Sequence, residues 1–256
     1  MENGTIKILG EGFINSGEYE SIKIMGSARS KGNVKCNEVN VFGNVKFDGD
    51  INIKNFVVNG KATIKGSLKA ERVRVNGQLS IDGDAEIDDL IITAQQKING
   101  NLKCNNVTVK GQLIVSESIY AQDIKVYGEM RNKENIECED IKVHGAIKCD
   151  GLLNGENIYI YSGGGSYCKE IGATNIEIGR SKDIFTFGIK FINIFSGKFK
   201  CNLIEGDSIE LEDVSIKDIR GKSISLVSNC DVENIEYSDK LLVSDNSSVK
   251  NSTKVG

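Results

Sequence analysis

The stretch "GKATIKGSLKAERVRVNGQLSIDGDAEI", residues 60–87, decides the fold because its glycines keep a regular count. Gly60 and Gly66, six residues apart, recur 17 residues later as Gly77 and Gly83. The count extends in both directions and gives two series: Gly26, Gly43, Gly60, Gly77, Gly111, Gly128 and Gly145, and Gly32, Gly49, Gly66, Gly83, Gly100 and Gly151. A period of 17 kept over eight successive units indicates an internal repeat.

Within each unit, apolar residues alternate with polar ones. Position 15 after the first glycine is β-branched throughout: Val41, Val58, Val75, Ile92, Val109, Val126, Val143 and Ile160. Position 13 is apolar in every unit as well. An inner period of two predicts β-strands and excludes an amphipathic helix.

Three features interrupt this alternation and predict corners. Positions 11 and 12 form a polar doublet that often contains Asn or Asp, as in Asn105-Asn106. Glycine at position 6 is expected to permit positive φ, and a third corner falls near position 0. Three short strands and three corners describe a triangular coil of about 17 residues. We therefore predict an all-β fold, a single-stranded parallel β-helix (β-solenoid), right-handed because parallel crossovers prefer that hand.

The repeat also predicts how the chain is organised. Residues 1–179 are expected to form a regular solenoid, and residues 180–245 a continuation with uneven coils. Ile158 and Ile160 are matched by Ile176 and Ile178 at a spacing of 18. Further matches relate Ile192 and Ile194 to Ile209 and Leu211 at 17, Ile209 and Leu211 to Ile224 and Leu226 at 15, and Ile219 to Ile235 at 16. Residues 246–256 are predicted to form a polar C-terminal tail.

Composition narrows the functional classes. A formal charge of -4 and a pI near 5.3 argue against nucleic acid as a partner. Seven cysteines without a Cys-x-x-Cys pair argue against a disulfide framework. No window of eighteen apolar residues and no signal-like leader is visible, so a cytoplasmic location is expected.

Residue types that often form chemical sites have structural explanations here. Cys36, Cys104 and Cys138 share inward position 10, several coils apart, which predicts core packing and no zinc site. His144, the single histidine, is expected to face solvent without a catalytic partner.

Two other motifs are weak candidates for ligand sites. Asp48, Asp50, Asp82 and Asp84 stand near corners, but calcium-binding solenoids repeat every nine residues. The run "SGGGS" (162–166) lacks the Gly-Lys-Ser/Thr of a phosphate loop and is expected to be a surface bulge. We therefore predict no catalytic residue, metal, nucleotide or other cofactor.

The ends and one aromatic group remain as candidate contact residues. Neither end has a helical period that could cap it, so stacking of ends through exposed strand edges is expected. The candidate end contacts are Ile6, Ile8, Leu241, Leu242 and Val243. A lateral aromatic patch is expected from Phe42, Tyr127, Tyr159, Tyr161, Phe185 and Phe187. The phenylalanines between 185 and 199 also fit a wider section of core.

The cadence of "GNVKCNEVNVFGNVKFDGDINIKNFVVNGKATIKGSLKAERVRVNGQL" resembles the repeats of the bactofilins, polymer-forming bacterial cytoskeletal proteins, nearly throughout residues 20–160. "GEGFINSGEYESIKIMGSA" and "IRGKSISLVSNCDVENIEYS" are similar to extended relatives found in Gram-positive bacteria. The resemblance implies a right-handed β-helical core that polymerises end to end without nucleotide. It also implies a homopolymeric scaffold in cell shape, envelope or spore-related processes. Membrane-associated or envelope proteins are expected partners, and a peripheral location at the inner face of the membrane is a further expectation. The chain departs from some family members because its coils start almost at Met1 without an apolar leader, which argues against direct membrane attachment.

Two other classes stay open. A left-handed β-helix acyltransferase would show six-residue repeats and typically a catalytic histidine. A non-polymerising surface-binding or adhesive solenoid would show outward threonine ladders or a signal peptide, whereas Thr63, Thr93 and Thr108 stand at three different positions of the unit.

Overall fold

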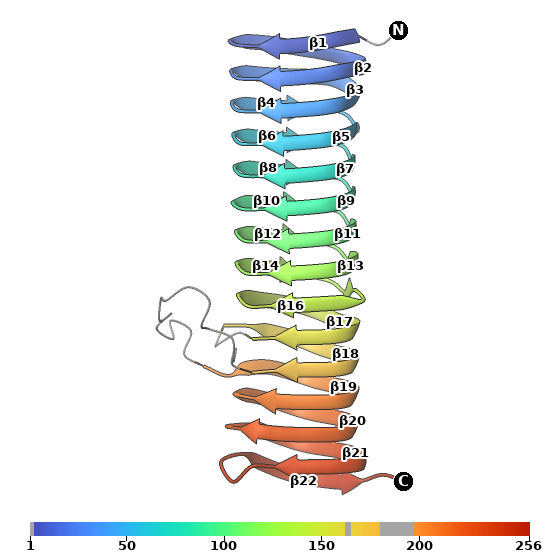
Figure 1. The fold of residues 1–256 in the computed structure, drawn as a ribbon, viewed down its shortest axis with the longest axis vertical. Helices are drawn as coiled ribbons and strands as arrows, with labels where there is room; N and C mark the ends of the chain where they lie inside the picture. Colours follow the sequence, from blue (N-terminus) through green and yellow to red (C-terminus); the bar gives the residue numbers. More distant parts are fainter. Residues whose placement is uncertain (1–2, 162–164, 180–196) are drawn as a thin grey trace. The chain divides into compact units, whose positions relative to one another are not determined.

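The structure is a computed structural model that describes residues 3–161, 165–179 and 197–256. These residues form strands and no helix (Figure 1). The first strands are β1 (Asn3–Ile8), β2 (Glu11–Ile24), β3 (Ser27–Val41), β4 (Asn44–Phe47), β5 (Ile51–Val58), β6 (Lys61–Ile64), β7 (Leu68–Val75) and β8 (Gln78–Ile81). The next are β9 (Ala85–Ile92), β10 (Gln95–Ile98), β11 (Leu102–Val109), β12 (Gln112–Val115), β13 (Ile119–Val126), β14 (Glu129–Asn132), β15 (Ile136–Glu137) and β16 (Asp140–Val143). The last are β17 (Ala146–Ile160), β18 (Tyr167–Ile178), β19 (Phe199–Glu212), β20 (Val214–Ser228), β21 (Asp231–Val243) and β22 (Ser248–Lys254).

The chain divides into two compact units by its internal contacts. The N-terminal unit contains residues 1–122 and 129–132, and the C-terminal unit contains residues 123–128 and 133–256. Each unit is a stack of coils joined by parallel strand pairing, which confirms the predicted β-solenoid.

The regular coils lie in the N-terminal unit. β5 pairs with β7 and places Ile51 opposite Leu68 and Val58 opposite Val75, 17 residues on in both cases. The burial of β5 alternates but skips once, at Lys54-Asn55, because the strand bends at the predicted polar doublet. The coil is completed by a four-residue strand, β6, which pairs with β4 and β8. As the chain descends in Figure 1, the near strands of this unit run from right to left, which is the right-handed winding.

The glycines serve a different purpose from the one predicted. Of the glycines at position 6, Gly32 has positive φ, at 83°, whereas Gly49 and its equivalents do not. A Cβ on Gly49 would lie 2.5 Å from the carbonyl carbon of Gly32 in the coil before. A Cβ on Gly60, at position 0, would overlap the carbonyl oxygen of Gly43. The prediction of left-handed corners is therefore wrong for most units, and close approach of successive coils requires the glycine instead.

The C-terminal unit has uneven coils. Ile158 lies opposite Ile176, Ile209 opposite Ile224 and Ile219 opposite Ile235, as predicted. However, β18 pairs directly with β19 and places Ile176 opposite Ile209. The prediction of Ile192 and Ile194 as the preceding partners of Ile209 and Leu211 is therefore wrong, and residues 180–196 lie outside the described residues.

The predicted polar tail also needs correction. Residues 248–254 form β22, which pairs in register with β21 and places Val249 opposite Val232. The segment was predicted to be a tail because its outward residues are polar, but the single apolar Val249 follows the ladder of the preceding coils. Backbone pairing thus extends the solenoid almost to the end of the chain.

The core of each unit consists of stacked apolar columns. Cys36 and Cys104 are buried within it, as predicted, whereas Cys138 is half-buried. Phe199 is buried opposite Val214, which agrees with core packing for the one described member of its aromatic group. Phe185 and Phe187 lie outside the described residues.

Candidate assembly surfaces

The N-terminal unit has an exposed strand edge at β1. Among the described residues, β1 pairs only with β2, with Ile6 opposite Ile22 and Ile8 opposite Ile24. Ile8 is buried and Ile6 half-buried within the same inward columns that later coils use. The outer edge of β1 thus carries backbone groups that a further parallel strand can satisfy.

The C-terminal unit has a corresponding edge. Leu241 and Val243 lie opposite Ile224 and Leu226, and within the described part of the chain they pair on this side alone. Leu242 and Val243 are exposed. Strand pairing places Leu241 and Val243 at positions 13 and 15 of the repeat, the same two positions that Ile6 and Ile8 occupy. Of the candidate end residues named from sequence, Ile6 and Ile8 thus lie on β1, and Leu241, Leu242 and Val243 lie at the end of β21, beyond the part that pairs with β22.

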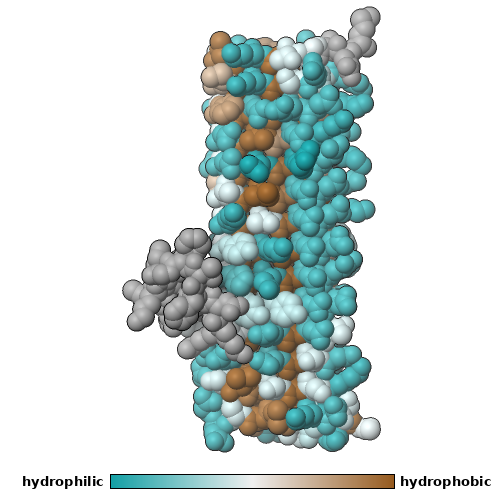
Figure 2. Space-filling view, viewed as in Figure 1, coloured by the Kyte–Doolittle hydropathy of each residue, from teal (hydrophilic) through white to brown (hydrophobic). Residues whose placement is uncertain are grey.

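A third surface, which we call the apolar corner, lies at the β1 end of the N-terminal unit. Leu9, Met25 and Phe42 directly follow Ile8, Ile24 and Val41, which are stacked in register. Their side chains are 65%, 49% and 51% exposed, and Phe13 in the adjoining strand is 78% exposed. Figure 2 shows apolar surface gathered at this end of the unit. A patch of this kind marks an interaction site more often than a free surface.

Basic side chains border the apolar corner on both sides. Lys7 and Lys23 lie opposite each other, two residues before Leu9 and Met25 respectively. Arg29 lies opposite Phe13, four residues after Met25. The Lys23 ammonium sits 5.4 Å from the centre of the Phe42 ring. Apolar side chains flanked by cations are suited to an anionic surface.

The C-terminal unit carries an aromatic stack. The rings of Tyr127 and His144 are 5.6 Å apart and nearly parallel, and those of His144 and Tyr161 are 5.4 Å apart. The ring of Tyr159 lies 6.5 Å from that of Tyr161, and the Lys142 ammonium lies 5.5 Å from the centre of the Tyr159 ring. The structure thus brings together the three predicted tyrosines, while Phe42 belongs to the apolar corner. The sequence prediction missed His144 as a member, although its spacing of 17 from Tyr127 and Tyr161 carries the signal.

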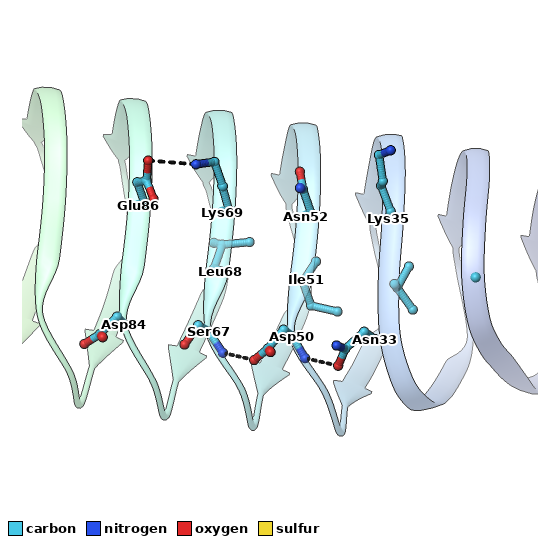
Figure 3. Close-up of a pocket in the computed structure, with 12 residues that line it drawn as sticks. Asn33, Lys35, Asp50, Ile51, Asn52, Ser67, Leu68, Lys69, Asp84 and Glu86 are labelled. Carbon is cyan, nitrogen blue, oxygen red and sulfur yellow. Dashed lines mark hydrogen bonds and ion pairs between the residues drawn. The ribbon is translucent and has the colours of Figure 1, made fainter.

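A shallow groove follows one corner of the N-terminal unit (Figure 3). Along it, Asn33 accepts a hydrogen bond from the amide of Asp50, and Asp50 accepts one from the amide of Ser67, each at 2.9 Å. Lys69 and Glu86 form an ion pair at 2.9 Å on the neighbouring column. These side chains bond one coil to the next, and this gives them a structural role.

The aspartates considered for calcium are also held in structural contacts, which join successive coils for Asp50, Asp82 and Asp84 and lie within one coil for Asp48. Asp84 accepts a hydrogen bond from the Asn101 amide at 2.7 Å, and Asp82 pairs with Lys65 at 2.6 Å. Asp48 pairs with Lys46 at 2.8 Å. Within residues 3–161, 165–179 and 197–256, no group of three or more His, Cys, Asp or Glu side chains is arranged to hold a metal ion. The described residues also contain no helix long and apolar enough to cross a membrane.

Three further cysteines form a column that the sequence prediction missed. Cys149 lies opposite Cys168, and Cys168 lies opposite Cys201. The spacings of 19 and 33 residues hide this column from a search for a period of 17. All three thiols are buried and free.

These features define a class of protein before any comparison is made. The chain is a parallel β-solenoid whose surface polar residues bond successive coils, and whose exposed apolar residues lie mainly at the strand edges, in the apolar corner and in the aromatic stack. This is the pattern of a structural repeat protein.

The particular family follows from comparison with known proteins. Residues 2–86 and 44–119 match the family model of Bactofilin, described as polymer-forming cytoskeletal. Residues 2–119 of the chain thus match the bactofilin family, which agrees with the resemblance seen in its repeats.

Two curated proteins of Bacillus subtilis (strain 168) are similar to this chain. "Uncharacterized protein YhbE" is 33% identical over 109 residues, which cover 42% of this chain and 45% of that protein. "Uncharacterized protein YhbF" is 32% identical over 106 residues, which cover 41% and 42%. The chain thus spans less than half the length of either relative. No solved structure matches it.

Proposed function

We propose that this protein is a non-enzymatic cytoskeletal scaffold that assembles end to end into homopolymeric filaments without nucleotide. The observation that carries the proposal is the pair of exposed edges at β1 and at Leu241–Val243, which present apolar residues at equivalent steps of the coil. A strand edge of this kind binds a further strand by backbone hydrogen bonds, while its apolar columns supply the buried area. In a bacterial cell, such a filament would organise cell shape or the envelope and recruit envelope proteins.

Electron microscopy tests this proposal. The purified chain, at near-physiological salt and without nucleotide or divalent metal, is expected to form filaments or sheets in negative stain. Ile8→Lys and Leu241→Lys each place a charge in an end column and are expected to shorten them. Tyr120→Lys is the matched control, because Tyr120 is exposed in β13, which among the described strands pairs with neither β1 nor β21.

Uniform short particles over a wide concentration range would overturn end-to-end assembly. A non-polymerising binding solenoid would then be the better interpretation. Filaments that Ile8→Lys and Leu241→Lys leave unchanged would place the contacts on other residues.

We also propose that the filaments are cytoplasmic and peripheral at the inner face of the membrane, through the apolar corner. Leu9, Phe13, Met25 and Phe42 supply apolar area for the lipid boundary, and Lys7, Lys23 and Arg29 supply charge for anionic headgroups. Among the described residues, no other contact accounts for the exposure of Phe13, which is 78%.

Vesicle sedimentation tests the attachment. The chain is expected to pellet with vesicles that contain phosphatidylserine, and less with purely zwitterionic ones. Phe13→Ser combined with Phe42→Ser should abolish pelleting, whereas Tyr127→Ser, in the aromatic stack, should leave it intact. Equal pelleting with both vesicle types would contradict recognition of anionic headgroups. No pelleting with either would contradict the lipid interpretation and leave a second protein as the occupant.

A further inference from the structure

The cysteine column of the C-terminal unit has a feature that packing alone does not need. Cys149 in β17 and Cys168 in β18 lie directly opposite each other, with both side chains 0% exposed. In-register parallel strands hold their Cα atoms about 4.8 Å apart, within the range of about 4.4–6.8 Å that disulfides span. The two sulfur atoms are therefore placed for a bond between successive coils.

The two thiols are chemically unequal. The Cys168 thiol hydrogen-bonds to Cys149, and this contact lowers the pKa of Cys149, whereas burial raises the pKa of Cys168. Cys149 also donates to the carbonyl oxygen of Glu134 at 3.4 Å. Next in the column, burial raises the pKa of Cys201 to about 12. The pair thus combines a thiol whose pKa is lowered with a directly opposed thiol that can complete a disulfide with it.

The backbone beside Cys149 is irregular. The register between β17 and β18 shifts between Cys149 and Leu152, so that Cys149 lies opposite Cys168 but Leu152 lies opposite Glu170. Cys36 and Cys104 are also buried, yet the pairing of β3 with β5 at Cys36 and that of β11 with β9 at Cys104 keep an unbroken register. A bulge weakens local pairing, so the coil at Cys149 is where a small reagent is expected to enter by local opening.

We propose that Cys149 and Cys168 form an oxidative modification site, at which a low-molecular-weight disulfide converts the two thiols into an intramolecular disulfide that links successive coils. The Cys149 thiolate attacks one sulfur of the reagent, whose S–S bond breaks and releases one thiolate. Cys168 then attacks the Cys149 sulfur, passes its proton to the departing thiolate, and forms the Cys149–Cys168 bond. In sum, two protein thiols are oxidised and one reagent disulfide is reduced to two thiols.

The geometry also predicts that this bond is reversible. Side chains held at a strand spacing of about 4.8 Å are somewhat wider apart than the Cβ separation of about 3.5–4.5 Å that relaxed disulfides adopt. Bond formation must draw the two coils together, and a strained disulfide is reduced more readily than a relaxed one. We therefore expect a labile bond and not a permanent staple.

The test uses the full chain, fully reduced and then incubated with oxidised glutathione under native conditions. Acid quenching, denaturation, alkylation and peptide mapping then report each cysteine. Cys149 and Cys168 should lose alkylation together and appear in one linked peptide, with a mass loss of about 2 Da that dithiothreitol reverses. Cys36 and Cys104 serve as matched buried controls and should stay alkylated.

Three variants separate the steps. Cys168→Ser should trap Cys149 as a mixed disulfide with glutathione, a gain of about 305 Da. Cys149→Ser should leave Cys168 unmodified, and Cys201→Ser should leave the linked pair unchanged. Circular dichroism before oxidation shows whether each variant is folded.

Two results would overturn the proposal. One is oxidation of Cys149 and Cys168 no faster than oxidation of Cys36 and Cys104, since the pair would then react only from the unfolded chain. The other is a Cys168–Cys201 linkage in place of Cys149–Cys168. Both readouts are independent of filament formation.

Discussion

The carboxylate of Asp50 accepts a hydrogen bond from the backbone amide of Ser67, one coil later, at 2.9 Å. Asn33 makes the same contact with the amide of Asp50, and Asn101 with the amide of Ser118 at 3.1 Å. A short side-chain acceptor at this corner thus satisfies the amide that the next coil turns outward. The ladder shown in Figure 3 explains why Asn and Asp recur at one step of the repeat.

Asp50→Ala is expected to lower the free energy of unfolding by about 1 kcal/mol, because the Ser67 amide loses its acceptor. Urea unfolding followed by circular dichroism measures the change. Asp50→Asn is the matched variant and should retain most of the stability, since Asn33 and Asn101 already use an amide oxygen. Equal losses in Asp50→Ala and in the exposed Asp88→Ala would show that the ladder contributes nothing.

Gly60→Ala is expected to destabilise the protein by about 1–3 kcal/mol, because the new methyl group meets the carbonyl oxygen of Gly43. Gly10→Ala is the control, since Gly10 begins the corresponding step of the first coil and a Cβ there has nothing within 4 Å. One coil already has an alanine at this position, Ala94. The loss of stability in Gly60→Ala therefore measures how far a coil can shift to accommodate a methyl group. A thermal midpoint for Gly60→Ala equal to that of Gly10→Ala would refute the close-approach explanation.

Gln96→Leu is expected to stabilise the protein by about 1–2 kcal/mol. Gln96 is 0% exposed, and neither polar atom of its amide has a hydrogen-bond partner among the described residues. Leu79 and Leu113 occupy the same step in the coils on either side, so a leucine completes an apolar column. Gln95→Leu, which breaks a 3.0 Å surface contact with Gln112, should give no such gain. Destabilisation by Gln96→Leu would show that the amide is satisfied in solution.

The Lys69–Glu86 pair predicts a pH dependence. The hydrogen bond from Lys69 lowers the pKa of Glu86 below its ordinary value of 4.5. A carboxylate with a lowered pKa in the folded state stabilises the fold above the unfolded pKa, and this contribution is lost as the pH falls through the folded pKa. Carboxyl chemical shifts followed by NMR should titrate lower for Glu86 than for a free glutamate, and Lys69→Ala should raise the midpoint. An unchanged midpoint in Lys69→Ala, or in high salt, would assign the shift elsewhere.

The sequence predicts most of the N-terminal unit because each coil repeats the one before it. Inward residues such as Val58 and Val75 can be read directly from the count of 17, and the register follows. The role of the glycines was not predictable, because the approach of Gly60 to Gly43 appears only when coils are stacked. The uneven coils were partly predictable, since Ile209 and Ile224 keep their column at a spacing of 15.

The residues of the candidate surfaces were also predictable only in part. The end residues and three tyrosines could be named from sequence because they obey the repeat. Phe13 and Leu9 were missed because they precede the first regular unit, where the count starts irregularly. The Cys149–Cys168 pair was missed because a register shift beside Cys149 changes the spacing to 19.

The direct pairing of β18 with β19 has a practical consequence for handling this protein. Ile178 and Leu211 are neighbours in the ladder although 32 residues separate them in the chain, so their pairing does not fix the length of the connection between β18 and β19. A reporter domain grafted into that connection is expected to leave every strand pair in place. A label inserted at this internal site would leave both edges free, and fluorescent fusions made there are expected to join the proposed filaments, whereas fusions to either end are expected to block them.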